Sequence, residues 1–113
     1  MTPLKLFRSA LGASLILLLP LQPLVAQAPS ERQLEVMAGS CANCHGTSGQ
    51  LAGAIPSIAG RPVSILEAQL IAFHRGEQPQ TTVMDRIARG FTEEELQALA
   101  AYFASQPPYR GGQ

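Results

Sequence analysis

Two thiols and an imidazole lie close together in the sequence Cys41-Ala42-Asn43-Cys44-His45. Thiols at positions i and i+3 lie on one side of a helical turn, so both can bond to the vinyl groups of one porphyrin. The imidazole of His45 then points at the iron. We interpret the motif as the attachment site of one covalent haem, beside which Gly46 lets the chain leave the helix.

Three other interpretations of the two cysteines stay open on these residues alone. A free C-x-x-C pair can act as a thioredoxin-like redox pair, although that needs a βαβ context that the sequence does not display. Two cysteines are few for a zinc site. A structural disulfide suits an exported protein. The protein would then be a thiol or metal-binding module without haem.

Met84, His74 and Met37 are the candidates for a second axial ligand of the iron. Met84 lies in a polar, turn-rich stretch where burial of a helix face does not explain a thioether, and methionine ligation raises a haem's potential. The alternative is a core-filling methionine. The helix dipole favours a surface histidine at the position of His74, and Met37 belongs to a helix packing face. We predict Met84. An iron left open would instead do peroxidase or gas-binding chemistry.

The start of the chain is typical of a secretory signal peptide. Lys5 and Arg8 supply its positive charge, and residues 11–19 supply an apolar run that is too short to cross a bilayer. We expect cleavage after Ala26, so that residues 1–26 are removed, with Ala28 as the alternative. The protein is therefore predicted to be periplasmic.

Residues 27–113 remain after that cleavage, which is enough for one domain only, and we predict no membrane span in it. A domain of this size has a modest core that a bound cofactor helps to consolidate. It contains no lysine and is slightly acidic. A nucleic-acid partner is not expected, because the arginines are scattered singly and form no basic stripe: Arg32, Arg61, Arg75, Arg86, Arg89 and Arg110.

Three helical segments are predicted, and no segment alternates as a strand, so the fold class is all-α. Ser30 is a suitable N-cap for the first segment, which runs to the cysteines. The second covers about residues 61–75. The third begins with Thr92 and Glu95, which have the spacing of a capping box. A short turn is expected at residues 84–88.

Four stretches of the chain, in this order and at this spacing, are more specific than the haem motif alone: Cys41-Ala42-Asn43-Cys44-His45-Gly46-Thr47, Gly53-Ala54-Ile55-Pro56-Ser57-Ile58-Ala59-Gly60, Met84-Asp85-Arg86-Ile87-Ala88-Arg89-Gly90-Phe91-Thr92 and Glu95-Leu96-Gln97-Ala98-Leu99-Ala100-Ala101-Tyr102-Phe103. Together they resemble class I c-type cytochromes. The resemblance is closest to the short bacterial group related to cytochrome c-553, cytochrome c4 and the haem subunit of flavocytochrome c sulfide dehydrogenase. It covers essentially all of residues 27–113.

The resemblance implies a small class I cytochrome c fold, with three main helices and a short turn around one covalently attached haem c. It implies that Cys41 and Cys44 form the thioether bonds. It also implies that His45 is the proximal ligand of the iron and Met84 the distal one.

Further residues take roles around the haem by the same resemblance. The carbonyl of Pro56 would accept a hydrogen bond from the second ring nitrogen of His45, which fixes the ring and tunes the iron. Ile58 and Leu70 would line the haem. Leu99 and Tyr102 would pack the last helix across the first.

The function implied by the resemblance is electron transfer without catalysis on a substrate of the protein's own. Its partners would be redox proteins, such as the flavoprotein subunit of a sulfide dehydrogenase or a terminal oxidase. Two positions depart from the family pattern: Gln33 replaces a glycine that allows close helix crossing, and Met37 replaces an aromatic residue. We therefore expect a looser or shifted crossing of the terminal helices.

Overall fold

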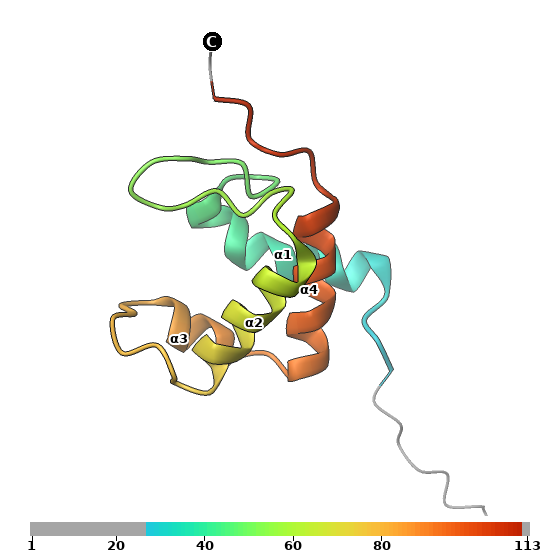
Figure 1. The fold of residues 1–113 in the computed structure, drawn as a ribbon. Coiled ribbons are helices and arrows are strands. Elements are labelled where there is room, and N and C mark those ends of the chain that lie inside the picture. Colours follow the sequence, from blue (N-terminus) through green and yellow to red (C-terminus); the bar gives the residue numbers. More distant parts are fainter. Residues whose placement is uncertain (1–26, 112–113) are drawn as a thin grey trace, which may run out of the picture.

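The computed structural model describes residues 27–111, which form four helices and no strand (Figure 1). The helices are α1 (Glu31–His45), α2 (Val63–His74), α3 (Met84–Ala88) and α4 (Glu93–Ser105). This confirms the predicted all-α class. None of the helices in this part of the chain combines the length and the apolar character needed to cross a bilayer. The expected signal peptide lies outside the described residues.

Helix α1 begins where predicted because Ser30 forms a capping box with Gln33. The Gln33 amide donates to Ser30 Oγ at 3.4 Å, and the Ser30 amide donates to Gln33 Oε1 at 3.0 Å. Two amides that have no partner inside the helix are thereby satisfied. The replacement of glycine at position 33 therefore serves the helix cap. At its other end α1 stops at Gly46, whose φ of 87° suits glycine and turns the chain away directly after His45.

Helix α2 is slightly shorter than predicted. It begins at Val63, with Pro62 as the N-cap residue, and it ends at His74. The turn expected at residues 84–88 is the short helix α3, which packs against α2. Neither helix is held by a side-chain cap at its start, so packing must stabilise both.

Helix α4 begins with the predicted capping box. The Glu95 amide donates to Thr92 Oγ1 at 3.2 Å, and the Thr92 amide donates to Glu95 Oε2 at 2.8 Å. Glu93 and Glu94 add negative charge in the first turn, where the positive end of the helix dipole favours it. These contacts fix the start of the helix that supplies more buried apolar residues than any other described element.

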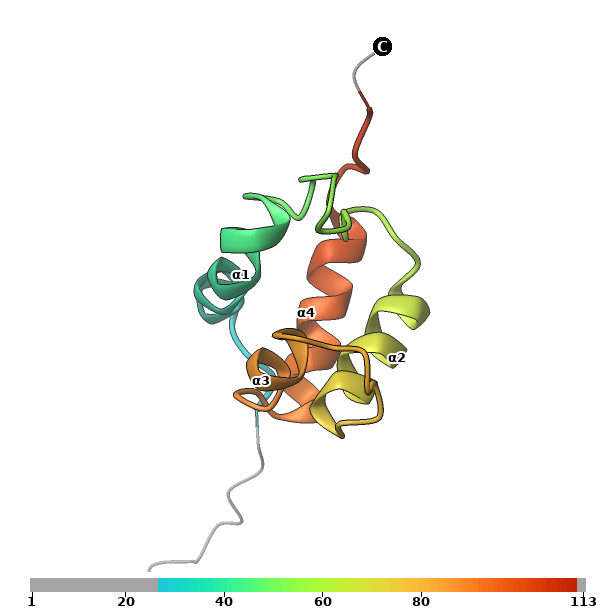
Figure 2. The ribbon, with the colours of Figure 1, turned by 90° about the vertical axis from the view of Figure 1, so that its left-hand side faces the viewer.

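Helix α4 lies between α1 and α2 and contacts both of them (Figure 2). Its inner face supplies Leu96, Leu99, Ala100 and Phe103, all of which are buried. Tyr102 is partly buried, and its ring lies edge-on against Phe103 with 5.1 Å between the ring centroids. The core is therefore organised around one helix face.

The connection between α1 and α2 is anchored at Gly49. The Gly49 carbonyl accepts hydrogen bonds from Ser57 Oγ at 2.9 Å, from the Ile58 amide at 2.8 Å and from the Ala59 amide at 3.0 Å. Gly49 has a φ of 72°, and a Cβ atom there would lie 2.6 Å from Ile58 Cγ1 and 2.9 Å from Phe103 Cδ1. Only glycine meets both demands. The loop is thereby held against α4.

The substitution Leu99→Ala is expected to lower the free energy of unfolding by about 2–5 kcal/mol. The reason is that Leu→Ala changes in a core leave cavities that the surrounding side chains only partly fill. Leu99 is 1% exposed on α4. Urea denaturation of the haem-loaded protein, followed by circular dichroism, measures the change. In the matched control, Val36→Ala, the side chain is 75% exposed on α1, so a change within about 0.5 kcal/mol is expected. Equal losses in the two variants would contradict the packing of α4.

Candidate functional site

A cavity of about 430 Å³ is lined by residues from all four helices and from the loops before α2 and α3. Its volume falls within the roughly 300–1,000 Å³ of small-molecule and cofactor sites. The two loops lie on the same side of the molecule (Figure 1). Most of the lining side chains are apolar, and these are Ala54, Ile55, Pro56, Ile58, Leu66, Leu70, Phe73, Val83, Met84, Ile87, Ala100 and Phe103.

The two cysteines of the C-x-x-C-H motif both line this cavity. Cys41 is buried and Cys44 is exposed, and both are free thiols. Helix α1 brings the two side chains to one wall because residues three apart share a helix face. The wall therefore offers two sulfur atoms, one deep and one at the surface, to a single ligand.

The environment of Cys41 differs from that of a redox-active thiol. Burial raises the pKa of the Cys41 thiol, and a contact between its sulfur and Ser40 Oγ at 3.9 Å only partly opposes the rise. Reactive members of C-x-x-C pairs instead have lowered pKa values, because the thiolate is the attacking species. The geometry thus disfavours the thioredoxin-like interpretation.

The imidazole of His45 is oriented by a backbone carbonyl. Its Nδ1 lies 2.7 Å from the carbonyl oxygen of Pro56. A carbonyl oxygen can only accept, so Nδ1 must carry the hydrogen and donate it. In the neutral ring, Nε2 then keeps its lone pair, as a metal ligand requires. His45 is 6% exposed and lines the cavity, so its ring is both buried and fixed in orientation.

Met84 lines the same cavity from a different element. It is the first residue of α3 and is partly buried. The loop residues directly before it, Thr81, Thr82 and Val83, line the cavity as well. The fold therefore brings a thioether and an imidazole, far apart in the sequence, to one cavity.

The other two candidates for the second axial ligand lie elsewhere. His74 is absent from the cavity wall, and its Nδ1 donates to the carbonyl oxygen of Ala88 at 3.1 Å. Met37 packs against the hydrophobic core, as its place on the helix face predicts, and does not line the cavity. Of the three candidates, only Met84 reaches the cavity.

Ile58 and Leu70 both line the cavity, where the resemblance places them. Sequence reasoning missed Arg61, Phe73 and Ile87, which line it too. Arg61 is the one lining residue with a permanent charge in the described part of the chain. No local signal in the sequence distinguishes Arg61 from the other scattered arginines.

These groups fit a haem. The apolar wall suits the porphyrin ring, and Cys41 and Cys44 supply the sulfur atoms for two thioether bonds. His45 presents Nε2 for an iron atom. Arg61, which lines the cavity, would supply a positive charge for a carboxylate group of the haem. Two thiols followed directly by an imidazole, in the C-x-x-C-H spacing, are typical of covalent haem attachment.

Comparison with known proteins leads to the same cofactor. Residues 29–103 match the family model described as cytochrome c oxidase, cbb3-type, subunit III. The chain is 42% identical over 76 residues to the cytochrome subunit of sulfide dehydrogenase of Chlorobaculum tepidum, covering 67% of this chain and 68% of that protein. It is 35% identical over 71 residues to cytochrome c-554(548) of Halomonas halodenitrificans, covering 60% of this chain and 86% of the relative.

A further relative is longer than this chain. The thiosulfate dehydrogenase electron acceptor of Stutzerimonas stutzeri is 38% identical over 76 residues, which cover 65% of this chain but only 35% of that protein. With the motif, the cavity and these matches together, the chain belongs to this family of c-type cytochrome domains, binds one haem c covalently through Cys41 and Cys44, and functions in electron transfer.

Proposed function

We propose that the protein is a periplasmic electron carrier whose iron is bound by His45 and Met84, and that it accepts electrons from a dehydrogenase acting on reduced sulfur compounds. One observation carries the ligand assignment. The oriented imidazole of His45 and the thioether of Met84 line one cavity, together with both cysteines. The sulfur-compound context is supported by relatives named for sulfide dehydrogenase and thiosulfate dehydrogenase.

When bound, the haem supplies an iron that gains and loses one electron. The chain's own residues set the conditions for that exchange. Pro56 holds the His45 ring through Nδ1, which fixes the direction of Nε2 and increases its basicity. The soft sulfur of Met84 favours the reduced state, and apolar side chains such as Leu66 and Phe73 exclude water, which also disfavours the more highly charged oxidised state.

An open iron with peroxidase or gas-binding activity is the alternative function. It would require Met84 to stay away from the iron. The thioether lies on the wall of the cavity, which favours the six-coordinate carrier.

Two segments without charged side chains, residues 46–60 and 78–84, contribute residues to the cavity wall, and we call them the framing segments. Within them, Ile55 and Val83 line the cavity and are also 37% and 51% exposed. Small apolar patches of this kind suit brief docking between redox proteins. We propose that the electron donor docks here.

Stopped-flow mixing of the oxidised protein with sulfide and a flavoprotein sulfide dehydrogenase is expected to give rapid reduction, seen in the haem absorption. Because no charge lies in the framing segments, the second-order rate constant is expected to fall less than about threefold between low and high salt. Electrostatically steered encounters lose 10-fold or more over such a range.

The matched variant for this experiment is Val83→Glu. It places a charge at the proposed docking patch, so slower reduction and a clear salt dependence are expected. If the dehydrogenase does not reduce the wild-type protein, the proposed electron donor is wrong. Rapid oxidation by a terminal oxidase would then indicate that the protein donates electrons to an oxidase. A steep salt dependence of the wild-type rate would contradict the apolar docking patch.

A further inference from the structure

We propose that His74 is a positioning residue for the iron ligand Met84: its hydrogen bond to Ala88 fastens the segment that carries Met84 to helix α2. We call residues 78–91 the methionine segment. The proposal rests on the proposed ligand role of Met84. His74 itself does not line the cavity, so any effect on the iron must pass through the methionine segment.

The methionine segment has few polar links to the rest of the protein. Its backbone bonds, such as those from the Thr81 amide to the Gln78 carbonyl and from the Arg89 amide to the Asp85 carbonyl, stay within it. The ion pair between Arg89 and Asp85 also stays within it. Among the hydrogen bonds and ion pairs of the described residues, the bond from His74 Nδ1 to the Ala88 carbonyl is the one that leaves the segment.

A segment of this kind cannot hold its own shape in water. Its helix α3 has five residues and no side-chain cap at its start, and isolated helices shorter than about 12–15 residues are marginal. Packing of the buried Ala88 against α2 supplies one restraint. The hydrogen bond from His74 supplies a second restraint, which unlike packing depends on direction.

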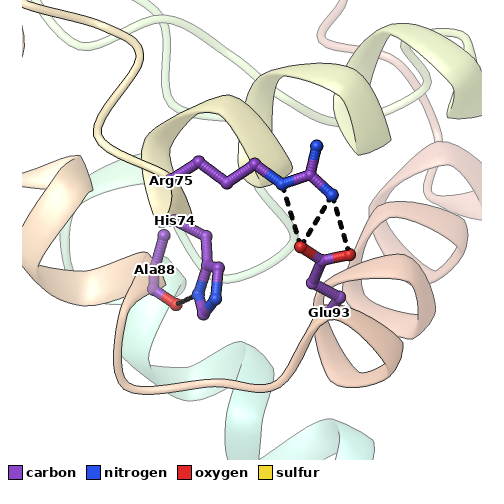
Figure 3. A network of polar contacts seen from close by, with 4 residues as sticks. All are labelled: His74, Arg75, Ala88 and Glu93. Carbon is purple, nitrogen blue, oxygen red and sulfur yellow. Dashed lines mark hydrogen bonds and ion pairs between the residues drawn. The ribbon is translucent and has the colours of Figure 1, made fainter.

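The bond lies where water competes poorly. His74 is the last residue of α2 and is partly buried, and Ala88 is buried. Figure 3 shows the imidazole reaching from the end of α2 to the Ala88 carbonyl. Since that oxygen can only accept, Nδ1 donates. The same carbonyl also accepts from the Phe91 amide at 3.2 Å, so removal of His74 does not leave it without a partner.

The neighbouring residue provides a built-in comparison. Arg75 forms a two-pronged ion pair with Glu93, with 3.0 Å from Nε to Oε1 and 3.1 Å from Nη2 to Oε2 (Figure 3). The side chains are 52% and 39% exposed, where ion pairs contribute little. This pair joins α2 to the start of α4, beyond the methionine segment. His74 and Arg75 thus lie side by side but secure different elements.

Ala88 lies about one helical turn beyond Met84 on α3. A restraint at Ala88 therefore limits where the thioether can move. By linkage, ligation of Met84 must stabilise the His74–Ala88 bond as much as that bond stabilises ligation.

The test is displacement of Met84 by imidazole in the oxidised, haem-loaded protein, followed by loss of the sulfur-to-iron charge-transfer band. His74→Leu is expected to tighten apparent imidazole binding about fivefold, the effect of losing one ordinary hydrogen bond. His74→Asn places an amide nitrogen near the position of Nδ1 and is expected to restore binding to within about twofold. Arg75→Gln is the matched control and is expected to leave imidazole binding unchanged.

Two results would overturn the proposal: unchanged imidazole affinity in His74→Leu, or an equal effect in Arg75→Gln. If His74→Leu does not mature, amide exchange of Arg86–Phe91 in the wild-type protein decides instead. Saturating imidazole should accelerate exchange there, and unchanged exchange would contradict the link. A wild-type protein without the charge-transfer band would refute Met84 as a ligand, which is a failure of the proposed function and separate from these outcomes.

Discussion

Replacement of Met84 by alanine is expected to abolish the sulfur-to-iron charge-transfer band and to lower the reduction potential. The thioether is the only proposed axial donor on α3, where it lines the cavity. Its loss would remove the proposed soft ligand, which favours the reduced state. The expected drop is on the order of 0.1–0.3 V, within the roughly 0.8 V over which axial ligands set haem potentials. Absorption spectra and a redox titration measure both effects.

Met37→Ala is the matched control for this substitution. Met37 has the same side chain but packs against the core from α1 and does not line the cavity. Its variant should keep the band and the potential while losing some stability. A Met84→Ala protein that keeps both the charge-transfer band and the reduction potential of the wild-type protein would disprove the ligand assignment.

Loss of both haem-attaching thiols, in the double variant Cys41→Ala and Cys44→Ala, is expected to remove the folded state. Within residues 27–111, nine apolar residues make up the buried core, and four of them are alanines. A cavity of about 430 Å³ would lie beside that core. Without haem, the apolar side chains of its wall would be left facing water, and a typical domain has only about 5–15 kcal/mol of stability with which to offset that lost burial.

Mass spectrometry of the purified polypeptide should find no haem mass on the double variant. Its circular dichroism should lack the helical signal and the cooperative melting of the wild-type protein. Ser40→Ala is the matched control, since Ser40 also lines the cavity from α1 but forms no bond to haem. A double variant that melts cooperatively without haem would show that the helices fold unaided.

Local signals in the sequence account for much of this fold. The capping pattern at Thr92 and Glu95 predicts the start of α4, and Ser30 predicts the start of α1, because caps depend on residues three apart. The C-x-x-C-H spacing predicts a shared wall for the cysteines for the same local reason. These features need no knowledge of how the helices pack.

The sequence could not predict contacts that depend on packing. His74 has the pattern of a surface histidine at a helix end, yet the arrangement of α3 against α2 turns it toward the Ala88 carbonyl. Arg61 has the pattern of a scattered surface charge, yet the path of the chain before α2 brings it to the cavity.

The three hydrogen bonds that the Gly49 carbonyl accepts hold the two ends of the next loop, residues 50–56, close together. Extra residues inserted at 52–54 would lengthen this loop but would not move its ends, and a longer loop adds only slowly to the entropy of closure. The shielding of the bound group from solvent can therefore be altered by insertion or deletion there, while the helical frame is inherited unchanged.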